Sequence, residues 1–426
     1  MSKINNTYVK RGGLIIVILY AFIYAFKCAG AGHDFEVFVD AGGKIIHGLN
    51  IYKPPFAQNL NYYYSPLFAL LMAPFSGLPI MISQLLWIFF SYFLLYWIWV
   101  LAKEYFDISK LTNRQQQIWL LVTFILTLRF ILVDIGYVQM TTFLLWATLQ
   151  SMNLFRREKY ISGAALLALA INIKLLPLAF VLYLLYRKQI KAVLLTCLFY
   201  AIYLYIPALY LGWSKNNLLL HDWFAIINPA NKEWLIEAEN GPSSLVALIP
   251  VYLTNTVGKL SFKRNFVNLP FGQVSLILNL VRLAFVLLTL AFLRTMPFQT
   301  VKGKIRQFWE MCYLFLAIPL LYPHQQQYAF LYIAPALMYI TWYFIVNWAV
   351  IKPKMNFLSW TVLAIIGFNF TPLVGRDVIS GPVCEILLYL RILPLAAIFL
   401  IPLLWICKPH EQIIAPIVLK EEKELA

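Results

Sequence analysis

Long apolar segments separated by short polar stretches dominate this chain. Segments such as 14–26, 85–101, 192–211 and 386–407 carry almost no charge. Because an α-helix rises about 1.5 Å per residue, about 20 apolar residues cross a bilayer core of about 30 Å. Backbone groups within lipid must be hydrogen-bonded inside the protein, and the segments lack the strict alternation of a lipid-facing barrel strand. The pattern therefore predicts an all-α protein that spans a membrane.

One apolar segment, 160–186, is interrupted in its middle. It lies between two basic stretches, and Asn172, Lys174 and Pro177 break the apolar run. We expect two short helices that enter and leave on the same side, with Lys174 at the tip. A charge at membrane depth costs at least a few kcal/mol, so this tip should line protein or water. With this pair, the total is about twelve spans; the others are expected at approximately 13–30, 81–102, 116–135, 138–155, 192–212, 273–293, 308–322, 328–351, 355–372 and 383–407.

Lys and Arg gather in short stretches between the apolar segments. The positive-inside rule places these stretches, and both termini, in the cytoplasm. We therefore expect one membrane domain over residues 1–426 that ends in a cytoplasmic tail at 408–426. Basic loops and a short tail suit the cell membrane, most simply a bacterial inner membrane.

Two long loops then face outward, 31–80 and 213–272. Each contains a stretch expected to form a short amphipathic helix, 34–42 in the first loop and 243–253 in the second. The second loop ends in a basic group that fits an outward location poorly, formed by Lys259, Lys263 and Arg264.

Composition supports a membrane protein and argues against other classes. Hydrophobic residues make up 62% of the chain and charged residues only 12%. The net charge of +16 could suggest a nucleic-acid partner, but the basic residues form short clusters rather than one stripe, so we expect none. The five cysteines lie singly in or beside apolar segments, which predicts buried thiols rather than a disulfide framework or a metal site.

Two of the expected spans contain two charged residues each. Arg129 and Asp134 share one span, and Glu385 and Arg391 share another. Charged side chains at membrane depth are usually paired or face a cavity. Their spacings place neither pair on one helix face, so we expect each residue to bond across helices in a structural role.

Asp34 is the clearest candidate for chemistry, because it closely follows the first apolar segment at the expected outer surface. A carboxylate there can accept a proton from a sugar hydroxyl, and partial desolvation would raise its pKa toward a useful range. Glu36 and Asp40 share another face of the same expected helix. An acidic residue at the end of a span can also be simply solvated, so Asp34 alone does not identify an active site.

Several short motifs accompany Asp34 along the chain. They are Asp34-Phe35, Ala41-Gly42, Gly48 with Tyr52, Tyr64-Ser65-Pro66-Leu67-Phe68, Asp134 to Met140, Ile173-Lys174-Leu175-Leu176-Pro177, Asn240 with Ser243-Ser244-Leu245, and Pro323 to Tyr328. In this order they resemble glycosyltransferase family 87, whose members use polyprenyl-phosphate mannose and have the C-type glycosyltransferase fold. The resemblance covers roughly residues 30–340.

The resemblance implies that Asp34 is the general base that acts on the acceptor hydroxyl. The leaving phosphate needs cations or hydrogen-bond donors, and Lys174 is the first candidate, with Gln139 near it. Further expected substrate contacts are Asp40, Tyr64, His324 and Arg376. The family resemblance also implies a lipid bilayer environment, a polyprenyl-phosphate sugar as donor and a glycolipid or glycan as acceptor. This donor carries its own leaving group, so we expect no metal ion and no other cofactor.

Some of these roles have alternatives. Lys174 could be an interfacial lysine that reaches toward water, and Arg376 could pair with Asp377.

Two motifs carry one inserted residue relative to the family. Tyr328 stands where the family pattern has histidine, so His324 would have to act from another position.

Three other functions stay open. A secondary transporter would also have many spans and intramembrane charges, although we find no internal repeat of the kind transporters usually show. A transferase of the same fold could move a different sugar, because the sequence does not reveal which hydrogen bonds select one. A scaffold subunit without catalysis would tolerate the loss of Asp34.

Overall fold

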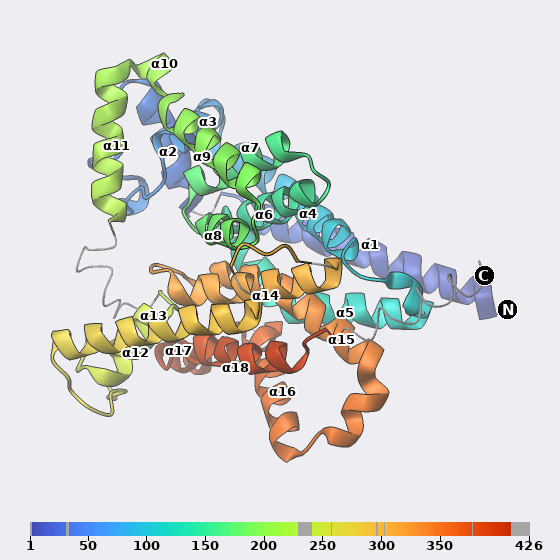
Figure 1. The fold of residues 1–426 in the computed structure, drawn as a ribbon. Coiled ribbons are helices and arrows are strands. Elements are labelled where there is room, and N and C mark those ends of the chain that lie inside the picture. Colours follow the sequence, from blue (N-terminus) through green and yellow to red (C-terminus); the bar gives the residue numbers. More distant parts are fainter. Residues whose placement is uncertain are drawn as a thin grey trace. The chain divides into compact units, whose positions relative to one another are not determined.

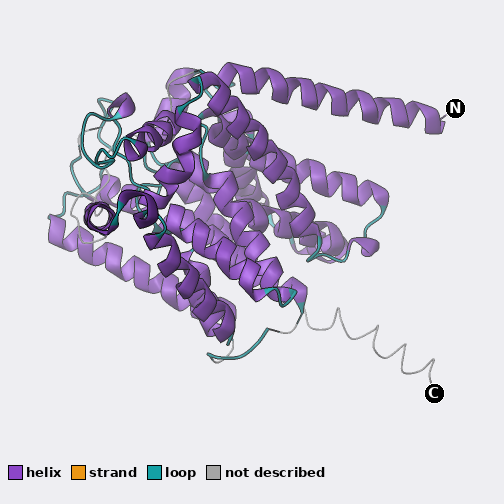
Figure 2. Ribbon diagram, turned by 90° about the horizontal axis from the view of Figure 1, so that it is seen from above, coloured by secondary structure: helices purple, strands orange, loops and turns teal. Residues whose placement is uncertain are grey.

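The computed structural model describes most of the chain, and every regular element in the described residues is a helix (Figures 1 and 2). The all-α prediction is therefore confirmed. The described residues are 2–30, 34–228, 241–256, 258–294, 297–301, 303–376 and 378–409. The chain divides into two compact units: unit 1 comprises Met1–Trp99, Leu132–Leu178 and Lys191–Asn228, and unit 2 comprises Val100–Ile131, Ala179–Ile190 and Pro229–Ala426.

Five helical segments are long and apolar enough to cross a membrane. They are α4 (Ile80–Lys103), α5 (Asn113–Gly136), α9 with α10 (Ile190–Leu211), α13 (Phe271–Leu293) and the segment Gln327–Lys354, which contains α15 (Ala334–Ile351). A sixth candidate is bent by 61° between α17 (Gly381–Tyr389) and α18 (Ile392–Ile406).

The expected count of about twelve spans is not confirmed, because several apolar segments form helices shorter than a full span. The segment expected at 138–155 becomes α6 (Thr141–Arg156), and the segment expected at 355–372 becomes α16 (Phe357–Phe370). The first expected span, 13–30, overlaps α1 (Ser2–Cys28), whose apolar part is Ile15–Cys28.

In unit 1, α2 (Asp34–Ile46) packs closely on α3 (Pro66–Ser76). The amphipathic helix expected near Asp34 is thus present. A Cβ atom at Gly42 would lie 2.7 Å from the backbone carbonyl carbon of Met72, so this approach of the two helices requires glycine. α3 begins where Ser65 caps it, with the N–H of Phe68 donating to the Ser65 hydroxyl oxygen over 3.2 Å.

The segment 160–186 is broken as its sequence suggests. α7 (Tyr160–Ile173) ends at Lys174, which is extended at φ −148° and ψ 134°, and α8 (Leu178–Tyr186) follows Pro177. Proline disfavours a helical conformation in the residue before it, which explains a break in this region. α7 belongs to unit 1 and nearly all of α8 to unit 2, so the same-side hairpin stays a prediction.

Unit 2 is built around α14 (Lys304–Leu321) and α15, which pack against each other and against α18. Most residues of α14 are buried. Glu310 lies within α14 and forms a buried ion pair with Arg187, with 2.7 Å between Oε1 and Nη2. The Tyr183 hydroxyl also donates to Glu310, over 3.0 Å. These contacts neutralise a carboxylate that burial alone would disfavour.

Candidate active site

Asp34 is the first residue of α2 and is only partly buried. Its Oδ2 atom accepts a hydrogen bond from Nε2 of Gln139, which lies between α5 and α6 and is 2% exposed. The backbone of Gln139 is itself held, because its carbonyl oxygen accepts from the indole N–H of Trp87 over 3.0 Å. Unit 1 thus presents a carboxylate whose orientation is set by a buried amide.

Lys174 and Tyr64 belong to the same group of side chains. The Lys174 Nζ atom lies 5.9 Å from the centroid of the Tyr64 ring. The ring packs edge-on against Phe38 of α2, with 4.8 Å between centroids, and the Tyr52 hydroxyl donates to the Tyr64 carbonyl oxygen over 2.7 Å. Two segments that are far apart in the sequence are therefore adjacent in unit 1.

Electrostatics couple these side chains to Asp34. Burial, followed by the carboxylates of Asp34 and Asp134, raises the pKa of Tyr64, so its hydroxyl stays neutral. Lys174 lies between helices and outside the candidate spans. Burial lowers the pKa of the Lys174 ammonium to about 8, and the same two carboxylates oppose that shift. The site therefore combines a carboxylate, a lysine whose pKa is lowered to about 8 and a neutral phenol.

The structure adds two residues that the sequence analysis did not assign. The hydroxyl of Ser65 donates to Oδ1 of Asn172 over 2.6 Å, and both side chains are fully buried. This bond ties the segment after Tyr64 to the end of α7, next to Lys174. In the sequence, Ser65 lies within one family motif and Asn172 directly precedes another. Neither motif indicates that the two side chains form a hydrogen bond.

The other acidic residues of α2 have different partners from Asp34. Glu36 accepts a hydrogen bond from Nε2 of Gln58 over 2.6 Å. Asp40 forms an ion pair with Lys44 of the same helix, with 2.8 Å between Oδ2 and Nζ. The Asp40 carboxylate is thus already in an ion pair within α2, and its expected contact with substrate stays a prediction. Among the described residues, no group of three metal-ligating side chains could hold a metal ion.

Asp134 has a contact that explains its presence near the end of α5. Its Oδ2 atom accepts a hydrogen bond from the hydroxyl of Thr142, in the first turn of α6, over 2.6 Å. A carboxylate at a helix N-terminus is stabilised by the unpaired N–H groups there. Asp134 thus links two consecutive helices, as its expected structural role requires.

Arg376 belongs to unit 2 and has an acidic partner there. It is 72% exposed in its side chain and pairs with Glu385, with 3.1 Å between Nη2 and Oε1; Lys259 pairs with the same oxygen at 2.7 Å. Asp377, the alternative partner, lies outside the described residues. Glu385 therefore bonds residues outside the helices rather than a neighbouring span.

His324 also belongs to unit 2, in the turn after α14, where it has φ 59°. Beside it, the carbonyl oxygen of Gln325 accepts from the N–H of Ser243 over 2.6 Å. The motif that contains Ser243 and the 323–328 segment therefore meet in unit 2. Asn240 of that motif lies outside the described residues.

Comparison with known proteins finds one family. The model of glycosyltransferase family 87 matches residues 62–302, which is more than half of the chain and includes Tyr64, Gln139 and Lys174. Asp34 precedes the matched range. No curated protein matches the sequence.

Proposed function

Because the chain belongs to glycosyltransferase family 87, we propose that it transfers a mannosyl group from a polyprenyl-phosphate donor to a hydroxyl of a glycolipid or glycan. The observation that supports this most directly is the hydrogen bond from Gln139 to Asp34, with Lys174 and Tyr64 in the same group of side chains. Helices of membrane length suit a lipid-linked donor that approaches within the bilayer. We place the reaction at the outer face of the cell membrane.

In the proposed reaction, the acceptor oxygen forms a bond to the anomeric carbon of the donor sugar while the bond from that carbon to the phosphate oxygen breaks. Asp34 takes the proton of the acceptor hydroxyl and becomes a carboxylic acid. Polyprenyl phosphate leaves with the electron pair of the broken bond. Attack opposite the phosphate inverts the anomeric configuration. The amide of Gln139 positions the carboxylate for this proton transfer.

Lys174 and Tyr64 have separate roles in this proposal. The ammonium of Lys174 offsets the negative charge that develops on the leaving phosphate. The Tyr64 ring offers a sugar an apolar surface, and its neutral hydroxyl can donate a hydrogen bond. His324 and Arg376 are kept as candidate phosphate contacts and Asp40 as a candidate sugar contact, although Arg376 and Asp40 already have ionic partners.

The test is sugar transfer by purified protein in lipid, from radiolabelled polyprenyl-phosphate mannose to an envelope glycolipid extract. We expect Asp34→Asn to abolish detectable transfer, because the amide cannot accept the proton. Glu36→Gln is the matched control: it removes the same charge from the same helix and should retain transfer.

Other outcomes separate the parts of the proposal. Equal transfer by wild type and Asp34→Asn would place the base elsewhere. Transfer from a polyprenyl-phosphate pentose or glucose, but not from the mannose donor, would keep Asp34 and change the sugar. Absence of transfer from every lipid-linked donor tried, by a protein that is folded, would reject the proposal.

A further inference from the structure

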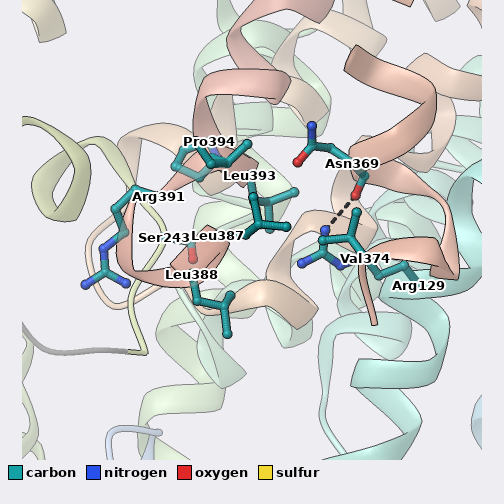
Figure 3. A pocket seen from close by; sticks show the side chains of 10 residues that line it. Arg129, Ser243, Asn369, Val374, Leu387, Leu388, Arg391, Leu393 and Pro394 are labelled. Carbon is teal, nitrogen blue, oxygen red and sulfur yellow. Dashed lines mark hydrogen bonds between the residues drawn. The ribbon is translucent and has the colours of Figure 1, made fainter. Parts of the chain in front are cut away.

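A small cavity lies in unit 2 where α17 gives way to α18 (Figure 3). Its lining includes Arg129 of α5, Ser243, Asn369 and the first residues of α18, Ile392, Leu393 and Pro394. Its free volume of about 10 Å³ corresponds to a single water-sized sphere. The cavity therefore has room for one polar atom or a very small group.

The guanidinium of Arg129 is buried at this cavity. Arg129 is 5% exposed. Its Nη1 donates to the carbonyl oxygen of Asn369 over 2.6 Å, and its Nη2 donates to Oε1 of Gln327 over 3.0 Å. Both acceptors are neutral, and they use two of the five N–H donors of a guanidinium. Among the described residues, no carboxylate lies within ion-pair distance of Arg129. A buried charge in this state favours the binding of an anion.

The N-terminus of α18 supplies an independent reason for an anion at the same place. α18 has 15 residues, and the side chain of its N-cap residue makes no capping hydrogen bond. These groups carry the positive end of the helix dipole. Arg391, the residue before α18, has the left-handed conformation φ 51°, ψ 40°, which is rare outside glycine. Arg391 also lines the cavity, and Figure 3 shows its side chain extending away from Arg129.

We propose that this cavity binds one oxygen of a phosphate group, held between the Arg129 guanidinium and the N-terminus of α18. Guanidinium groups and helix N-termini both bind phosphate in proteins, and here they share one cavity. The small volume admits a single phosphate oxygen while the rest of the group stays outside. The phosphate belongs either to a lipid headgroup or to free inorganic phosphate. The proposal does not rest on the transferase activity.

The experiment measures thermal unfolding of the purified full-length protein in a neutral detergent. Inorganic phosphate is titrated against sodium chloride of equal ionic strength. In a second arm, phosphatidylglycerol is compared with diacylglycerol, which lacks the phosphate. We expect a rise in Tm with phosphate, with phosphatidylglycerol or with both, because a ligand that binds only the folded state stabilises it. A response to the lipid alone would identify a headgroup as the source.

The variant Arg129→Gln should bind the phosphate group at least about tenfold more weakly, because a charge-assisted hydrogen bond is lost. Arg282→Gln is the matched control, since it removes the same charge from the exposed Arg282–Asn279 pair on α13 and should respond like wild type. An equal response from Arg129→Gln, or no rise in Tm in either arm for wild type, would overturn the proposal.

A second variant keeps the test decisive if Arg129→Gln does not fold. Ser243→Val retains the guanidinium of Arg129 and fills part of the cavity, because valine has two methyl groups where serine has one hydroxyl. We expect this variant to lose the response to phosphate. A response that survives Ser243→Val would show that phosphate binds outside the cavity and would also overturn the proposal.

Discussion

Replacing Gln139 by Met is the most informative perturbation of the candidate active site. The side chains have similar length, but Met cannot donate the hydrogen bond that Nε2 of Gln139 gives to Oδ2 of Asp34. Gln139 is 2% exposed and Met is apolar, so the substitution should be tolerated within the packing of unit 1. The change therefore tests the orientation of the carboxylate rather than the fold.

The expected magnitude follows from the kind of bond that is lost. A hydrogen bond to a charged acceptor contributes about 1.5–3 kcal/mol. Since about 1.4 kcal/mol corresponds to a factor of ten, kcat/KM for sugar transfer should fall by roughly 10- to 150-fold. The amide stabilises the ionised form of Asp34, so without it the acidic limb of the pH profile of kcat/KM should move to higher pH. A residue with a purely structural role would lower activity without moving that limb.

The matched control for Gln139→Met is Gln58→Met. Gln58 donates the same kind of hydrogen bond, over 2.6 Å, to Glu36 on the same helix, but this bond is exposed. We expect less than a twofold change in kcat/KM for the control. The reasoning is refuted if folded Gln139→Met has a kcat/KM within twofold of wild type and an unshifted pH profile.

Three further predictions concern charge and stability. Lys174→Met should lower kcat/KM for sugar transfer. Because the pKa of Lys174 is lowered to about 8, the wild-type lysine loses its charge as the pH rises through that value, and transfer should decline above about pH 8. A flat pH profile of wild-type transfer would argue against a role for the Lys174 cation. Ser65→Ala removes the cap of α3 and the bond to Asn172, and should lower the free energy of unfolding by about 1–3 kcal/mol, measured by chemical denaturation in detergent. Glu310→Gln removes the negative charge that pairs with the buried guanidinium of Arg187 and should lower the free energy of unfolding by about 3–5 kcal/mol; an unchanged Tm would contradict this.

Helix content was readable from the sequence, but helix length was not. The segments around α4, α5 and α13 are continuous and apolar, and their bounds agree with the expected spans to within a few residues. The two segments expected to be long loops also contain α3 and α11 (Trp213–Ile227). Their aromatic-rich sequences do not predict these two helices. Both helices bury some apolar side chains in unit 1 and expose others, such as Leu71 of α3 and Trp213 of α11, and composition does not distinguish the two groups.

The membership of the candidate site was predicted only in part. Separate sequence motifs predict four site residues that lie together in unit 1: Asp34, Gln139, Lys174 and Tyr64. Asp40 was selected with them, but its nearest charge is Lys44, one turn along the same helix. An i, i+4 pair is a local property that could have been recognised from the sequence.

The sequence by itself determined that this chain is helical, is rich in segments of membrane length and resembles glycosyltransferase family 87. Apolar length, helical period and motif order are properties of neighbouring residues, so they can be read along the chain. Only the tertiary structure decided that Gln139 bonds Asp34 across 105 positions, that Ser65 meets Asn172, and that the buried Arg129 donates to two neutral acceptors. Such contacts depend on how whole helices pack, and a close approach between distant segments has no signature in either segment alone.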